Sequence, residues 1–168
     1  LTEASQTITF HGVPTRPVPS LLRGFSAPVR LQIDLPAADL LFLLRTDADS
    51  FNRWQAAQTL AMRTLIAGAD SVGRNEPVSF DNALIDALAD VAEDEALEAA
   101  FRAQVLQLPS EADIAREIGR DVDPDAIAAA RNQIRARIAE RVGTRLAGLV
   151  DRLKSDAPYA PDAVSAGR

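Results

Sequence analysis

Apolar and polar residues alternate over two short stretches near the start of the chain. Residues 6–10 (QTITF) and 29–33 (VRLQI) place an apolar side chain at every second position, the pattern of a half-buried strand. Prolines in this part of the chain restrict the backbone to extended or turn conformations and remove hydrogen-bond donors. They are Pro14, Pro17, Pro19 and Pro28. The pattern predicts two or three short strands within residues 1–34.

From Pro36 onward, apolar residues recur every three or four positions, which is the period of amphipathic helices. The sequence predicts a polar loop over residues 68–77, because Gly68, Gly73 and Pro77 fall there. Helices are expected over residues 36–45, 51–67, 95–108, 110–118 and 124–154, together with one that is capped by Ser79 and contains Leu84, Ile85, Leu88 and Val91.

Several residues mark the ends of the expected helices. Ser110 precedes Asp113 in the spacing of a capping box, and Gly119 is suited to end that helix. Asp123 and Pro124 give an N-cap followed by a proline at the first helical position. The long helix that follows carries one apolar stripe, formed by Ile127, Ala130, Ile134, Ile138, Val142, Leu146, Leu149 and Leu153.

These elements predict a mainly α fold with a short β segment followed by an antiparallel helical bundle or α-superhelix. Residues 160–164 (APDAV) have the pattern of a further helix start, so the chain is expected to be a segment of a longer protein.

Composition excludes several classes of chemistry. The chain has one histidine and no cysteine, so H-E-x-x-H and thiol or disulfide chemistry are impossible within it. A net charge of −6 argues against binding to nucleic acid or to an anionic membrane. No apolar run approaches the ~20 residues that span a bilayer. The absence of cysteine suits a reducing compartment, and we expect a cytoplasmic location.

Each residue with reactive potential has a better structural interpretation. His11 follows an expected strand and is interpreted as a turn or packing residue. Asp121, Asp123 and Asp125 lack the glycine and glutamate of an EF-hand, so capping is favoured over calcium binding. Asp47 and Asp49 are interpreted in the same way.

Residues 93–95 (EDE) are interpreted as a solvated helix terminus, because adjacent carboxylates on a helix surface do not converge. Trp54 is assigned to the core with Phe51. The arginines of residues 124–154 are expected to form a solvated face with scattered ion pairs. The sequence therefore gives no catalytic, cofactor-binding or metal-ligating residue.

The strings at residues 17–23 (PVPSLLR), 25–29 (FSAPV) and 51–58 (FNRWQAAQ) resemble the bacterial branch of the aminopeptidase N family of zinc metallopeptidases. The L-x-L-P string at residues 106–109 and Asp123-Pro124 fit the same order. The resemblance covers essentially the whole chain and is strongest over residues 6–67.

The resemblance implies two incomplete domains. Residues 1–34 would be the terminal strands of the small β-sandwich domain, and residues 35–168 the first helices of the C-terminal helical domain. In the family, zinc is held by H-E-x-x-H and a downstream glutamate, and the amino terminus of the substrate is held by a G-x-M-E-N segment. Both motifs lie in a preceding domain, and neither occurs in this sequence. The chain itself is therefore expected to hold no zinc, although zinc is implied in the full-length enzyme. The implied partners are the catalytic domain of the same polypeptide and the peptide substrates of the whole enzyme.

Two functional hypotheses follow. The first is a non-catalytic part of a zinc aminopeptidase that removes N-terminal residues from peptides, in which the helices cover the catalytic domain and limit access. The alternative is an independent helical scaffold or adaptor that binds a partner protein between stacked helices.

Overall fold

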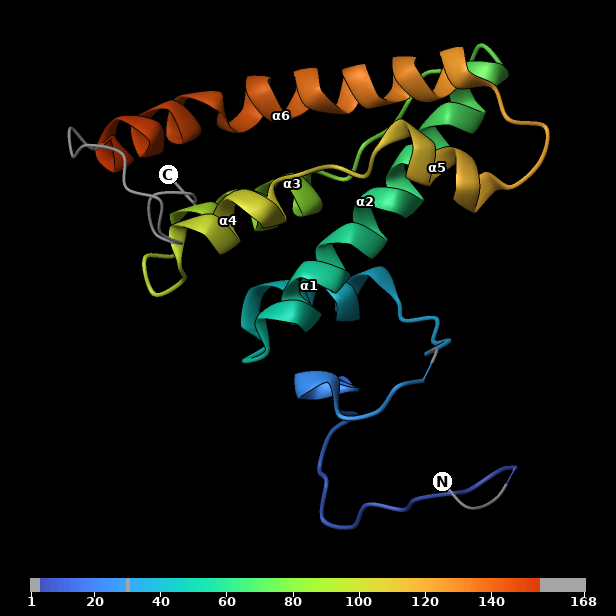
Figure 1. Ribbon diagram of the computed structural model, residues 1–168, viewed down its shortest axis with the longest axis vertical. Coiled ribbons are helices and arrows are strands. Elements are labelled where there is room, and N and C mark those ends of the chain that lie inside the picture. The colour runs from blue at the N-terminus through green and yellow to red at the C-terminus, as the bar shows by residue number, and fades with distance from the viewer. Residues whose placement is uncertain (1–3, 30, 155–168) are drawn as a thin grey trace.

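A computed structural model describes residues 4–29 and 31–154 of the chain. The described part is mainly helical, as the sequence predicts (Figure 1). Its elements are the 3-10 helix η1 (Arg23–Phe25) and the α-helices α1 (Ala37–Thr46), α2 (Ser50–Gly73), α3 (Asn82–Glu93), α4 (Ala99–Val105), α5 (Glu111–Ile118) and α6 (Pro124–Leu153).

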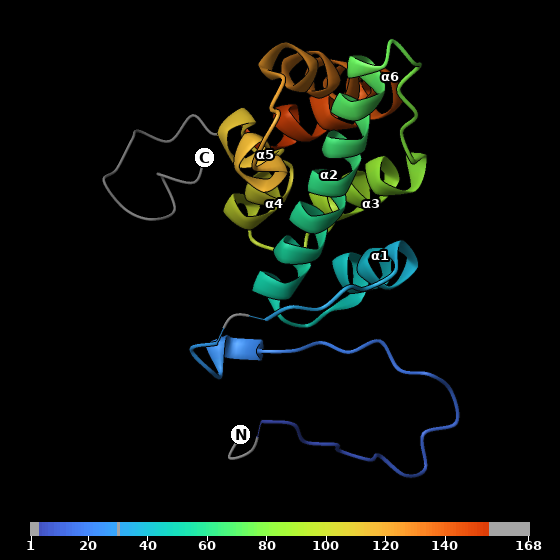
Figure 2. The ribbon, with the colours of Figure 1, turned by 90° about the vertical axis from the view of Figure 1, so that its right-hand side faces the viewer.

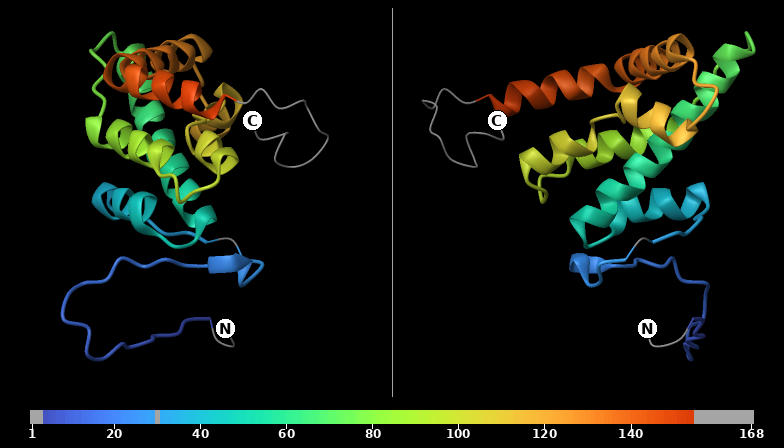
Figure 3. Two further views of the ribbon diagram at one scale, coloured as in Figure 1. Left: turned by 90° about the vertical axis from the view of Figure 1, so that its left-hand side faces the viewer. Right: turned by 45° about the vertical axis from the view of Figure 1, so that its right-hand side comes forward.

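The helix α2 is the centre of this arrangement. It contacts η1 and each of the other five α-helices. In Figure 1, α2 runs from α1 near the middle of the molecule up to α6, which lies across one end. Residues 4–34 lie at the opposite end, beyond α1, and Figures 2 and 3 show the same order from other sides. The molecule is therefore held together by packing onto a single helix.

The loop predicted over residues 68–77 begins six residues later than expected, because α2 continues to Gly73. Gly68 is buried inside the helix, where a glycine ordinarily costs stability. A Cβ atom at this position would lie 3.2 Å from Val78 Cγ1 and 3.3 Å from Ala130 Cβ. The absence of a side chain at Gly68 therefore lets α6 and the loop after α2 pack closely against α2. This tertiary packing outweighs the local tendency of glycine to end a helix.

The helix that contains Val91 also begins later than predicted. Asp81, not Ser79, caps α3, and its Oδ1 accepts a hydrogen bond from the Ala83 N–H at 2.8 Å. Val78 and Phe80 remain outside the helix, where both side chains lie against Gly68. With residues 78–80 outside the helix, Val78 and Phe80 fill the space beside Gly68, and the N-cap of α3 lies two residues later than predicted.

The other predicted caps are confirmed. The Ser110 hydroxyl accepts from the Asp113 N–H at 3.1 Å, and Gly119 ends α5 with a φ of 82°. Asp123 Oδ1 accepts from the Ala126 N–H at 3.0 Å, with Pro124 in the first turn of α6. The helix predicted over residues 95–108 is shorter, because Asp94 accepts bonds from the N–H groups of residues 96 and 97 and forms a turn.

The apolar stripe of α6 enters two clusters. Ile127, Ala130 and Ile134 are buried against α2 and α5. Further along, Val142 is buried against Ile85 and Ala89 of α3. Leu153, at the end of the stripe, is 45% exposed. A third cluster joins α1, α2, α3 and α4 and contains the largest number of buried side chains, among them Leu44, Leu60, Leu88 and Val105.

The short β segment expected within residues 1–34 is not confirmed, because the described residues 4–29 and 31–34 contain no strand. A strand is stable only when a neighbouring strand satisfies its backbone groups. Here the Val29 N–H donates to the Ala27 carbonyl in a local turn, and residues 4–17 are exposed. The helix start expected at residues 160–164 lies outside the described residues.

Gly68 gives a direct test of this packing. Replacing Gly68 with leucine should lower the free energy of unfolding by about 1–3 kcal/mol, because the side chain must displace Val78 and Ala130. Gly143→Leu is the matched control, since nothing lies within 4 Å of a Cβ at that position of α6. Urea denaturation measures both. Equal effects of the two substitutions would contradict the packing role of Gly68.

Candidate functional site

The most elaborate polar structure near a cavity lies where residues 16–35, here called the strap, cross α1 and α2. Arg16 donates two hydrogen bonds to the Asp39 carboxylate, at 3.1 and 2.7 Å. Asp39 sits in the first turn of α1 and is 7% exposed. A bidentate arginine–carboxylate contact fixes the orientation of the two side chains as well as the distance between them. The start of the strap is therefore held on the start of α1.

A second contact joins η1 to the start of α2. Asp49 Oδ1 caps α2 by accepting from the Asn52 N–H at 3.0 Å, and Oδ2 accepts from the Gly24 N–H at 2.9 Å. Gly24 has a φ of 61°, a region that glycine occupies without strain. The Asn52 amide donates to Ser20 Oγ and to the Leu21 carbonyl, at 3.0 and 3.1 Å. One helix terminus therefore binds both η1 and the residues just before it.

A third contact closes the far end of the strap. Arg63 of α2 donates to the Leu35 carbonyl at 2.8 Å and to Asp34 Oδ1 at 2.6 Å. Leu35 is buried against the cluster shared by α1 and α2. Three separate polar contacts therefore hold the strap on the helices without any strand pairing among the described residues.

The electrostatics follow from these contacts. The hydrogen bonds from Arg16, with its positive charge, lower the pKa of Asp39. The pKa of Asp49 is lowered chiefly by the Gly24 N–H and then by the Asn52 N–H. Both carboxylates are thereby kept in the ionised form that accepts these bonds.

A cavity of about 600 Å³ lies between the strap and the two helices. Leu31 and Ile33 of the strap form one wall, and Leu40, Leu43 and Ala56 contribute from the helices. Ser20, Asn52 and Arg63 lie at its polar margin. The Arg63 and Asn52 side chains are already engaged in holding the strap, so the arrangement serves to join two parts of the chain and offers no set of groups for acid–base or nucleophilic chemistry.

The residues considered from the sequence do not converge on a reactive centre. His11 is exposed in the non-helical part of the chain that precedes η1. Asp123 is used as a cap, while Asp121 and Asp125 on either side of it are exposed. Asp47 accepts from the Asp49 N–H at 2.9 Å. Within the described ranges, no group of three or more His, Cys, Asp or Glu residues is placed to hold a metal ion.

The acidic residues 93–95 do not converge, as the sequence suggests, but two of them pair with arginines where a solvated terminus was expected. Glu93 binds Arg145 of α6, Asp94 Oδ2 lies 3.6 Å from Arg53, and Glu95 is exposed.

Trp54 is half-buried against the α1–α4 cluster, and its ring centroid lies 5.6 Å from that of Phe51. None of the six α-helices described combines the length and apolar character needed to cross a membrane.

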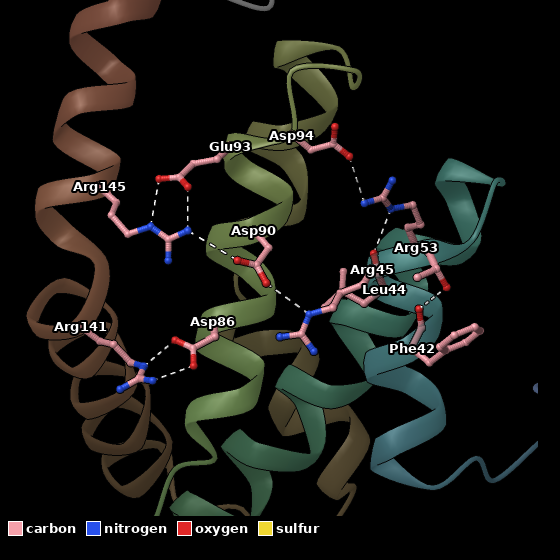
Figure 4. Close-up of polar contacts among 11 residues, drawn as sticks. Phe42, Leu44, Arg45, Arg53, Asp86, Asp90, Glu93, Asp94, Arg141 and Arg145 are labelled. Carbon is pink, nitrogen blue, oxygen red and sulfur yellow. Dashed lines mark hydrogen bonds and ion pairs between the residues drawn. The ribbon is translucent and has the colours of Figure 1, made fainter.

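Two buried arginines have structural roles that sequence reasoning did not identify. Arg53 donates from Nε to the Leu44 carbonyl at 2.9 Å, and Arg102 donates to the Ala92 carbonyl at 3.1 Å. Each therefore satisfies a carbonyl in the last turns of α1 or α3, where no intrahelical donor is present. Figure 4 shows Arg53 between Leu44 and Asp94. Helix termini buried by tertiary packing leave no signal in a local pattern.

The arginines of α6 also pair more regularly than the sequence suggested. Arg141 and Arg145 bind carboxylates of α3 (Figure 4). The signal was present, since Asp86, Asp90 and Glu93 recur at intervals of four and three along one helix face, and the two arginines are four apart. Recognising it required knowing that α3 and α6 are neighbours.

Comparison with known proteins decides the family. A family model described as a domain of unknown function with ARM repeats (DUF3458_C) matches residues 37–168. The chain belongs to this family. A second model, described as a domain of unknown function with an Ig-like fold (DUF3458), matches residues 1–34.

The relatives and a solved structure are aminopeptidases. The chain is 41% identical over 172 residues to aminopeptidase N of Caulobacter vibrioides, covering all of this chain and 19% of that protein. It is 35% identical over 146 residues to aminopeptidase N of Escherichia coli, covering 87% of this chain and 17% of that protein. The chain thus corresponds to part of the C-terminal region of an aminopeptidase N-like protein and spans about a fifth of its relatives' length.

The crystal structure of Legionella pneumophila aminopeptidase A in complex with aspartic acid has the same fold over this region. Its TM-score is 0.75 at 26% sequence identity, and the match covers 94% of this chain and 19% of that one. The aminopeptidase N resemblance drawn from the sequence is therefore confirmed.

Asp49 tests the contact between the strap and α2. Asp49→Ala should lower the free energy of unfolding by about 1–2 kcal/mol, the cost of losing a helix cap, and should speed tryptic cleavage after Arg23. Ser50→Ala is the control, because Ser50 is exposed at the first position of the same helix. If neither stability nor cleavage distinguished the two variants, the anchoring role of Asp49 would be wrong.

The Arg16–Asp39 pair makes a prediction about pH. NMR titration of the Asp39 carboxyl should give a pKa below the usual ~3.9, and Arg16→Gln should restore the usual value. Because the folded-state pKa is the lower one, the stabilisation by this pair is present above about pH 4 and disappears as the pH falls through the folded-state pKa. An unchanged Asp39 pKa in Arg16→Gln would contradict the contact.

Proposed function

We propose that the chain is a non-catalytic structural part of a zinc-dependent aminopeptidase that removes N-terminal amino acids from peptides in the cytoplasm. The observation that carries the proposal is similarity to aminopeptidase N over the whole length of the chain, at 41% identity, while the chain matches only a fifth of that relative. A sequence that follows the family so closely is expected to share its parent reaction.

The residues of this chain do not fit a catalytic zinc ion. Such sites take three protein ligands, commonly two histidines and a carboxylate, and this chain has a single histidine in an exposed position. We therefore place the zinc and the groups that activate water in the remainder of the parent polypeptide. The contribution of this chain is shape and position, and no step of the reaction is assigned to its side chains.

We propose that residues 1–34 are the last strands of a β-sandwich domain and residues 35–168 the first helices of the C-terminal domain. The Ig-like family model over residues 1–34 supports this division. Exposed apolar side chains in that segment, including Ile8, Phe10 and Val29, are those that neighbouring strands would cover. The described residues of this segment form no strand, because the strands that would pair with them belong to the rest of the sandwich.

We further propose that the helices cover the catalytic domain of the same polypeptide and limit which peptides reach it. A cover of this kind needs a fixed shape, and the packing of every described helix onto α2 supplies one. The contacts of Arg16, Asp49 and Arg63 hold the strap on α1 and α2, which would fix the angle between the sandwich and the helices.

If the zinc site lies outside this chain, peptidase activity should be found in the full-length protein and not in the present chain. The full-length protein should release alanine from an alanyl anilide, lose that activity to a chelator and regain it with zinc. The present chain should show no turnover above a buffer blank. Zinc-restored turnover by this chain, purified away from longer forms, would overturn the structural assignment.

The access role predicts a difference between substrates. In the full-length protein, Gly68→Leu should change kcat/KM for a long peptide more than kcat/KM for the small anilide, because it alters the shape of the cover and leaves the reacting groups in place. Gly143→Leu should change neither. A parallel loss for both substrates would count against a role in access.

A further inference from the structure

The two halves of α6 are held in different ways. The first half, residues 124–137, packs on α2 and α5 through a cluster whose buried members are Leu65, Ala69, Ile114, Ala126, Ile127, Ala130 and Ile134. The second half, residues 138–153, rests on α3 with a small cluster of Ile85, Ala89 and Val142, to which Ile138 and Leu146 contribute partly buried side chains. Figure 3 shows this half extending beyond α2, above α3 and α4.

Charged pairs lie along the weaker half. Arg141 binds Asp86 with two hydrogen bonds, at 2.6 and 2.7 Å. One turn further on, Arg145 binds Glu93 with two more, at 3.0 and 2.7 Å. Paired, parallel bonds of this kind are the strongest form of arginine–carboxylate contact, and they join residues more than fifty positions apart.

A shared carboxylate connects these pairs to a third helix. Asp90 lies between them on α3, with Oδ1 3.5 Å from Arg145 and Oδ2 3.3 Å from Arg45 of α1. Figure 4 shows the resulting row of charges from α6 across α3 to α1. Networks of several charges contribute more than isolated surface pairs, because each side chain is already restrained by its neighbours.

We propose that these pairs form an electrostatic latch that holds residues 138–153 of α6 on α3 and that releases this half when the pairs are broken, while residues 124–137 stay packed. Release would uncover the apolar surface formed by Ile85, Ala89 and Val142. The latch joins α6 to α1, the helix that also carries the Asp39 contact with the strap.

The charges of the latch respond to salt and acid. Its side chains are about 33–50% exposed, so salt screens their attraction. Asp86 faces Arg141 and Arg145 of α6 and Arg45 of α1, and these cations lower its pKa. Glu93 faces Arg145 and Arg152, which lower its pKa likewise. The stabilisation is therefore complete above about pH 5 and is lost as the pH falls through the folded-state pKa values.

A charge-swap experiment tests the latch on the full chain. Asp86→Arg and Arg141→Asp each place like charges opposite one another, and the double variant restores an opposite pair with the direction reversed. Arg135→Asp is the control, because it makes the same charge change on an exposed residue of α6 for which the described structure gives no ion pair. Hydrogen–deuterium exchange compares residues 138–153 with residues 126–134, and circular dichroism checks that each variant is folded.

Each single variant should exchange roughly three- to tenfold faster over residues 138–153, with residues 126–134 unchanged. The double variant should return to within about twofold of the original rate, and ~1 M NaCl should accelerate the original chain in the same region. The latch is disproved if Arg141→Asp behaves like Arg135→Asp, if the double variant fails to recover, or if both halves of α6 accelerate equally. A single variant that unfolds is judged by the double variant and by the salt response.

Discussion

Close packing against α2 is the constraint on which the described structure depends. Five other helices approach this one helix, and small side chains along it let them do so. Ala56, Ala57 and Ala61 face the cluster of α1, α3 and α4, while Gly68 and Ala69 face α6. A larger side chain on these faces would push a neighbour away, so the sequence of α2 determines how near every other element lies.

Polar groups then fix the directions that apolar packing leaves open. Arg53 and Arg102 each donate to a carbonyl at the end of a neighbouring helix, and Asp49 caps α2 while it also binds η1. The two arginine contacts join consecutive helices at their turns, whereas the Asp49 contact with η1 and the pairs between α3 and α6 join elements farther apart in the sequence. Apolar packing sets distances, and the charged groups set angles. A proposed cover for a catalytic domain needs both.

Local signals predicted the elements whose ends are capped by their own sequence. Ser110, Asp123 and Pro124 act where the pattern placed them, and the stripe of α6 is buried through most of its length. The predictions that were wrong concern positions where tertiary contacts override the local pattern. Gly68 was interpreted as a helix breaker, but it is a residue of α2 that α6 approaches closely. Asp81 caps α3 in place of Ser79, because Val78 and Phe80 lie outside the helix and cover Gly68. The strands expected in residues 1–34 need partners that these residues do not supply. The polar contacts of the strap join positions 23 to 32 residues apart and could not be read from local spacing.

In the proposed function, this chain shapes an aminopeptidase without taking part in its chemistry. A crystal structure of the full-length protein with zinc and a bound amino acid would decide this. We expect every zinc ligand and every side chain touching the amino acid to lie outside these 168 residues, and residues 1–34 to contribute the last strands of a β-sandwich. A zinc ligand or a contact with the bound amino acid from within the chain would contradict it.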